Sequence, residues 1–81
     1  AISLMRQLVT ENPTFVLGWR QLATWYDTAN RPRECLEACE QYVKLEPANP
    51  VAYVYRGEAR RGTADRRGAL ADFQRAFEID P

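Results

Sequence analysis

A period of 34 residues runs through the whole chain and restricts its fold more than any other feature. Three segments align without a gap and each ends on a proline: AISLMRQLVTENP at 1–13, CLEACEQYVKLEP at 35–47 and ALADFQRAFEIDP at 69–81. Within each segment, apolar residues recur at i, i+3, i+6 and i+7, which is the spacing of one helix face. Because a unit of this length cannot bury such a face alone, the repeats must stack on one another.

The stretches between these segments predict a further helix in each repeat. In VLGWRQLATWYDTAN, apolar residues recur at helical spacing, namely Val16, Trp19, Leu22, Ala23 and Tyr26. Asn30 followed by Pro32 is typical of a helix end and a new helix start. We therefore expect one helix over about 14–29.

Similar signals predict the helix boundaries of the next repeat. Asn49 and Pro50 suit the N-cap and the first helical position, and Gly62 is expected to close that helix. Asp65 is expected to cap the final helix. The pattern as a whole predicts five helices, the first of which is the second helix of its repeat.

These residues resemble the tetratricopeptide repeat, a 34-residue helix-turn-helix unit with the pattern W-x2-L-G-x2-Y, then A-x3-F, then P. The first complete repeat carries Trp19, Leu22, Ala23 for the usual Gly, Tyr26, Cys35 for Ala, Cys39 for Phe, and Pro47. The second carries Tyr53 for Trp, Gly57, Ala69, Phe73, Ala76 and Pro81, with Arg56 and Arg60 in place of Leu and Tyr. The resemblance implies an all-α, right-handed solenoid of about five helices.

The resemblance implies that residues 1–81 form one domain with three parts. Residues 1–13 would be the second helix of a preceding repeat, and residues 14–47 and 48–81 would each be a complete repeat. About three such units are needed for stability. We therefore expect either a piece of a longer solenoid or ends that pack on other copies.

Composition argues against several classes of function. Lys plus Arg and Asp plus Glu both number 11, so the zero net charge favours neither nucleic acid nor an anionic membrane. Histidine is absent, which removes the commonest general base and most zinc sites. The chain also lacks an apolar run of membrane-spanning length and a signal-peptide pattern. We expect a soluble, cytoplasmic chain that uses no cofactor and catalyses no reaction.

The two cysteines raise the question of a metal or redox site. Cys35 and Cys39 are four residues apart on one helix face, where an unstrained disulfide fits poorly and further metal ligands are lacking. Their equivalents one repeat later are Ala69 and Phe73, which are both apolar. The sequence therefore predicts buried, reduced thiols that act as small hydrophobic side chains, with a redox or metal role as the alternative.

Tyr42 is large where the next repeat has the small Ala76, and Cys39 is small where it has Phe73. We expect the Tyr42 ring to occupy the space that a Phe at position 39 would fill.

Trp25 is large where the next repeat has Ala59. One interpretation is that its indole packs against the preceding helix near residues 2–9. The other is that it stays exposed and serves as an aromatic anchor for a partner.

Five arginines form the main charge cluster, facing only Glu58 and Asp65 in the nearby sequence: Arg56, Arg60, Arg61, Arg66 and Arg67. We expect a solvated, partly ion-paired face on which the arginine stems cover apolar surface while their charged ends stay in water. The alternative is a surface for an acidic partner or nucleic acid.

The resemblance implies a concave groove built mainly by the first helices. By analogy, its lining would be Leu17, Arg20, Gln21, Thr24, Asp27 and Thr28, with Val51, Val54, Tyr55, Glu58 and Arg61 in the next repeat. Some family members clamp the C-terminal carboxylate of chaperones with Lys, Asn and Arg at fixed groove positions. Those positions hold Arg20, Thr24, Tyr55 and Val51 or Val54 in this chain, so we expect no such clamp.

Two functions remain open. The resemblance implies a protein-interaction scaffold that binds a peptide or protein segment in this groove, without metal or cofactor. The alternative is a structural or self-association module within a larger protein or enzyme.

Overall fold

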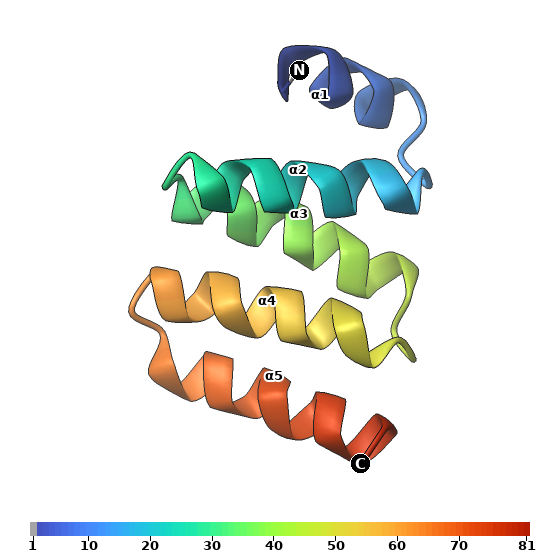
Figure 1. Cartoon of the computed structure of the whole chain (residues 1–81). Helices are drawn as coiled ribbons and strands as arrows, with labels where there is room; N and C mark the ends of the chain where they lie inside the picture. The colour runs from blue at the N-terminus through green and yellow to red at the C-terminus, as the bar shows by residue number, and fades with distance from the viewer. Residues whose placement is uncertain (1) are drawn as a thin grey trace.

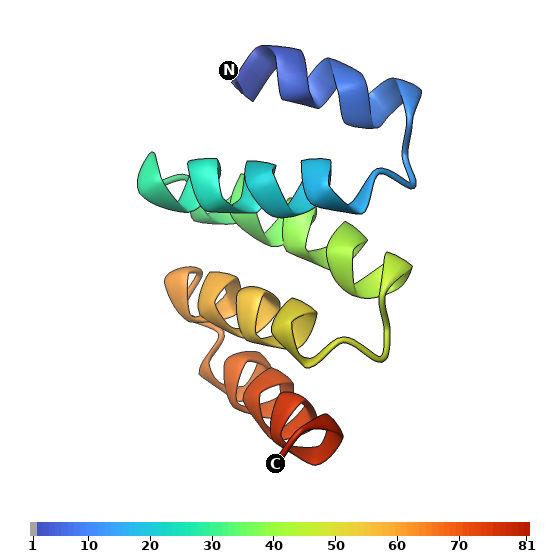
Figure 2. The same cartoon turned by 45° about the vertical axis from the view of Figure 1, so that its right-hand side comes forward.

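The computed structural model describes residues 2–81, which form five α-helices and no strand. Their order is α1 (Ile2–Glu11), α2 (Val16–Thr28), α3 (Pro32–Leu45), α4 (Pro50–Gly62) and α5 (Arg66–Ile79). Successive helices pack on one another, with α1 at one end of the stack and α5 at the other (Figures 1 and 2). The all-α repeat architecture predicted from the 34-residue period is confirmed. The first residue of the predicted segment 1–13 lies outside the described range.

The two turns inside the repeats have the same geometry. Asn30 and Ala64 both adopt left-handed backbone conformations, with φ of 58° and 65°. In each turn the following amide donates a hydrogen bond of 2.8 Å to a carbonyl five residues earlier, from Arg31 to Tyr26 and from Asp65 to Arg60. This is the bond of a Schellman helix end. The helix predicted to close at Gly62 does end there, but the left-handed residue is Ala64, which lacks the conformational freedom of glycine.

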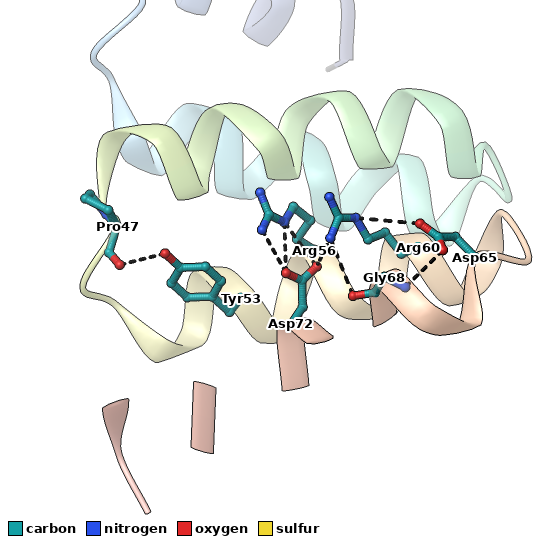
Figure 3. A network of polar contacts seen from close by, with 7 residues as sticks. All are labelled: Pro47, Tyr53, Arg56, Arg60, Asp65, Gly68 and Asp72. Atoms are coloured by element: carbon teal, nitrogen blue, oxygen red, sulfur yellow. Dashed lines mark hydrogen bonds and ion pairs between the residues drawn. The ribbon is translucent and has the colours of Figure 1, made fainter. Parts of the chain in front are cut away.

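The two turns between successive repeats are also alike, and an aromatic side chain holds each one. The Trp19 indole donates a hydrogen bond of 2.9 Å to the Pro13 carbonyl oxygen. One repeat later the Tyr53 hydroxyl donates to the Pro47 carbonyl oxygen at 2.8 Å (Figure 3). Each bond ties the first helix of a repeat to the turn that precedes it and satisfies a carbonyl with no helical partner.

The predicted N-caps of the last two helices are confirmed. The Asn49 side chain accepts a hydrogen bond from the Val51 amide at 3.0 Å, and Asp65 accepts one from the Gly68 amide at 2.9 Å. Phe15 precedes α2 and offers no capping side chain, and α2 runs over a shorter span than the predicted 14–29.

The core consists of two clusters of buried side chains. The first has members on each of the helices α1, α2, α3 and α4. It contains Val9, Leu22, Ala23, Tyr26, Cys35, Ala38, Cys39 and Ala59. The second lies near the C-terminal ends of α3 and α5 and the N-terminal end of α4. It contains Tyr42, Val43, Ala52, Tyr53 and Ala76. Both cysteines are buried free thiols, as the sequence predicts. Trp25 is half-buried and, like Ile2 and Met5 of α1, packs against the first cluster.

A buried carboxylate joins α4 to α5. Asp72 is only 2% exposed, and Arg56 and Arg60 of α4 both bind it (Figure 3). Arg56 donates from Nη2 to Oδ1 at 2.8 Å and from Nε to Oδ2 at 3.0 Å, while Arg60 donates from Nη1 to Oδ2 at 3.1 Å. The hydrogen bond to Asp72 raises the pKa of Arg56 above its ordinary value. The expected face with charged ends in water is therefore wrong for these two arginines.

The previous repeat holds apolar residues at the same three positions. Leu22, Tyr26 and Ala38 stand where Arg56, Arg60 and Asp72 stand 34 residues later, and all three are buried in the first cluster. The exchange leaves Asp72 satisfied, because both of its oxygens accept hydrogen bonds from arginine. An ionic network thus replaces an apolar contact between the two helices of one repeat.

We predict that Asp72→Ala lowers the free energy of unfolding by about 2–3 kcal/mol, because two half-buried guanidinium groups lose their partner. The triple variant Arg56→Leu, Arg60→Tyr and Asp72→Ala installs the residues of the first repeat and should be at least as stable as the original chain. Urea unfolding followed by circular dichroism measures both variants. If the triple variant is no more stable than Asp72→Ala alone, the apolar residues of the first repeat cannot replace the ionic network of the second.

Candidate functional site on the face of α2 and α4

The residues predicted to line the groove form one stripe on α2 and one on α4. Their spacing of three and four residues places each set on a single helix face. Most are exposed, with Leu17 at 63%, Val51 at 43% and Val54 at 41%. Gln21 and Tyr55 are half-buried. We call this surface the α2–α4 face; its exposed members are Leu17, Arg20, Thr24, Asp27, Thr28, Val51, Val54, Glu58 and Arg61.

Tyr55 connects the two stripes. Arg20 of α2 donates a hydrogen bond of 3.3 Å from Nε to the Tyr55 hydroxyl, and its guanidinium carbon lies 5.7 Å from the centre of the Tyr55 ring. The hydrogen bond raises the pKa of Arg20. The Tyr42 ring meets Tyr55 edge-on with 5.6 Å between centroids, and burial raises the pKa of Tyr42. The Tyr55 ring is thereby held from two sides.

A hollow of about 290 Å³ opens on this face. Residues of α2, α3 and α4 line it: Ala23, Thr24, Asp27, Cys35, Cys39, Val54, Tyr55 and Glu58. Its exposed lining is mostly apolar. Pockets of this kind, apolar with a few polar groups, are the usual form of a binding site.

The two thiols lie at the floor of the hollow. Cys35 donates a hydrogen bond of 3.3 Å from its sulfur to the Ala23 carbonyl oxygen. A hydrogen bond to Cys35 and burial raise the pKa of Cys39 well above its ordinary value, so this thiol stays protonated at neutral pH. Among residues 2–81, no three His, Cys, Asp or Glu side chains come together as a metal site would require. The floor is therefore an apolar surface.

The hollow exists because an aromatic ring is missing. In the second repeat the Phe73 ring packs against Gly57 so closely that a Cβ at position 57 would lie 2.7 Å from the ring. The first repeat has Ala23 and Cys39 at these two positions. The Ala23 methyl group takes part of the room that a ring would need, and the short Cys39 side chain leaves the rest open.

The predicted role of Tyr42 is wrong. Its ring belongs to the second core cluster, and its hydroxyl accepts a hydrogen bond of 3.2 Å from the Asn49 side chain. Cys39 belongs to the first cluster, and Tyr42 is not among the residues that line the hollow beside it. Cys39 and Ala23 border the hollow from beneath, since they are only 0% and 1% exposed.

The structure brings together five of the eleven predicted groove residues around the hollow: Thr24, Asp27, Val54, Tyr55 and Glu58. The other six lie outside its lining: Leu17, Arg20, Gln21, Thr28, Val51 and Arg61. Sequence reasoning missed the floor, which consists of Ala23, Cys35 and Cys39. The signal that could have found it is the paired departure from the repeat pattern, with Ala for Gly at 23 and Cys for Phe at 39.

The rim of the hollow carries two carboxylates. Glu58 pairs with Arg61 one turn along α4, at 2.5 Å. Asp27 has no cation of residues 2–81 within ion-pair distance. Asp27 and both thiols line the same hollow. The rim therefore keeps one carboxylate, Asp27, without an ion-pair partner.

We predict that Cys39→Phe alone destabilises the chain, because the ring would meet the Ala23 methyl group. Ala23→Gly should rescue it, since the pair then matches Gly57 and Phe73. A double-mutant cycle measured by urea unfolding should give a favourable coupling of about 1–3 kcal/mol. Strictly additive effects would show that positions 23 and 39 do not share this space.

Comparison with solved structures supports the repeat architecture. Two crystal structures of MamA match the chain, each with a TM-score of 0.88. The first is 25% identical over 99% of this chain, and the second is 24% identical over 98%. The chain spans less than half the length of either structure, at 44% and 46%. No protein-family model and no curated protein sequence matches it. The fold is therefore a tetratricopeptide-like stack of helices, of the type found in MamA.

Proposed function

We propose that this chain is a protein-interaction scaffold that binds a peptide or protein segment on the α2–α4 face. The observation that carries the proposal is the hollow on that face, which is apolar inside and has the carboxylate of Asp27 at its rim. Folds of this type serve in general as interaction scaffolds. The division into parts 1–13, 14–47 and 48–81 belongs to the same proposal.

The dimensions of the hollow favour a side chain as its occupant. Its volume of about 290 Å³ is at the lower limit for pockets that take whole small molecules. Exposed apolar side chains continue beyond it, at Leu17 on α2 and at Val51 on α4. A segment lying across both helices would bury these side chains in addition to the hollow. An extended or helical stretch of a protein partner fits this arrangement better than a cofactor.

The chemistry of the face supports binding without catalysis. Cys39 is protonated and buried, and Cys35 donates its hydrogen bond to a backbone carbonyl. The chain has no histidine to act as the usual base beside a cysteine nucleophile. No helix of residues 2–81 is long and apolar enough to cross a membrane. We propose a cytoplasmic location, which suits the two free thiols.

A second candidate function, self-association, is favoured by the outer face of α5. Phe77 is 66% exposed. Val43, at the equivalent position of the previous repeat, is only 7% exposed, because it packs in the second core cluster with residues of α4. Leu70 is exposed in the same way, at 59%. A further helix on this face would bury both side chains, and it could come from a second copy or from another part of a larger protein.

We predict that photo-crosslinking locates the partner on the α2–α4 face. A photoreactive phenylalanine analogue at Leu17 or at Val51 should capture the same protein partner in the cells that make this chain. The same analogue at Lys44, which is exposed on α3, serves as the matched control and should capture none.

The outcomes separate the two candidate functions. Equal capture from Lys44 and Leu17 would remove the case for the α2–α4 face. An analogue at Phe77 that yields a crosslinked pair of identical chains, with no capture from Leu17, would favour self-association instead.

A further inference from the structure

The hollow has the shape left by a ring that the neighbouring repeat possesses. In the second repeat, Phe73 of α5 fills the space against Gly57 of α4. The same space in the first repeat is bounded by Ala23 of α2 and Cys39 of α3, and it opens toward α4. The Tyr55 ring forms part of the wall, and the hollow between it and α2 stays open.

We propose that the hollow receives an aromatic side chain of the partner, which supplies from outside the ring that Phe73 supplies within its own repeat. The proposal rests on the proposed function and makes it more specific, because it names the side chain that the α2–α4 face selects.

The lining suits an aromatic ring better than a polar group. Val54 and the Ala23 methyl group offer apolar contacts on opposite sides of the hollow. The two sulfur atoms lie at the floor, and sulfur makes favourable contacts with ring edges. Tyr55 adds a ring whose orientation is fixed by Arg20 and Tyr42, so that an edge-to-face contact is available without reordering. A protonated Cys39 keeps charge out of the floor.

The rim specifies the residues next to the ring. Asp27 lines the hollow and has no cation of residues 2–81 within ion-pair distance, whereas Glu58 on α4 is paired with Arg61. A lysine or arginine within one or two positions of the inserted ring would reach Asp27. The occupant is therefore a segment that carries an exposed Phe, Tyr or Trp next to a basic residue, and an acidic neighbour is disfavoured.

A randomised heptapeptide library displayed on phage tests the proposal when it is selected against this chain. Enriched peptides should share an aromatic residue with Lys or Arg within two positions. Replacing the aromatic residue by Ala in a synthetic peptide should weaken binding at least tenfold in calorimetry. Replacing the basic residue by Glu should also weaken it, and Asp27→Asn should reduce that difference.

The double variant Ala23→Gly with Cys39→Phe fills the hollow from within and should bind the selected peptide at least tenfold more weakly. Lys44→Ala, at an exposed position of α3 outside the lining, is the control, with affinity close to the original. A second readout does not depend on the folding of the double variant. The selected peptide should slow alkylation of Cys35 in the original chain severalfold, whereas its Ala-substituted form should not.

Each contrary result has a distinct meaning. Selected peptides that need no aromatic residue, or that bind the filled variant and the original chain equally, overturn the ring proposal. If those peptides still lose affinity on Leu17→Ser or Val51→Ser, the proposed function stands without it. Peptides indifferent to the filled variant and to both serine variants overturn the ring proposal and the binding role of the α2–α4 face together.

Discussion

The contact between the two helices of one repeat decides most of what this molecule can do. In the second repeat, α4 and α5 meet at Gly57 and Phe73, where a ring packs on a bare backbone. In the first repeat, α2 and α3 carry Ala23 and Cys39 at the equivalent positions. Because protein interiors are close-packed, a volume removed at such a crossing must be filled or left as a hollow. The hollow on the α2–α4 face is the second outcome.

The second repeat, between α4 and α5, accommodates another exchange by a different physical route. Arg56, Arg60 and Asp72 replace an apolar set, and a network of charged hydrogen bonds takes over the contact between α4 and α5. Such a network contributes little net stability compared with apolar packing, yet it penalises any arrangement in which Asp72 loses a partner. The repeat geometry therefore survives both exchanges: charged hydrogen bonds replace the apolar contact in one repeat, and a hollow remains in the other.

The sequence alone predicted the fold well because its period acts on every residue. The stripes at i, i+3, i+6 and i+7, the caps at Asn49 and Asp65, and the turn at Asn30 are local or periodic signals, and all appear in the structure. The Asp72 network does not follow from the nearby sequence, where Glu58 and Asp65 are the acidic residues close to Arg56 and Arg60. Asp72 approaches these arginines from the next helix. Tyr42 was misplaced for a similar reason, since its neighbours on α4 and α5 decide where the ring lies.

The residue types show a paired departure at positions 23 and 39, but the hollow itself depends on how three helices pack. Its wall atoms lack the contacts that a ring would give them, and this lost contact energy is a cost to the unliganded chain. A partner that inserts a ring would restore those contacts. The contact energy that the unliganded chain lacks would then contribute to the free energy of binding. In a chain of this size, where the buried core is small, such binding would also raise the stability of the folded state. Binding and folding would then depend on the same crossing of α2 and α3.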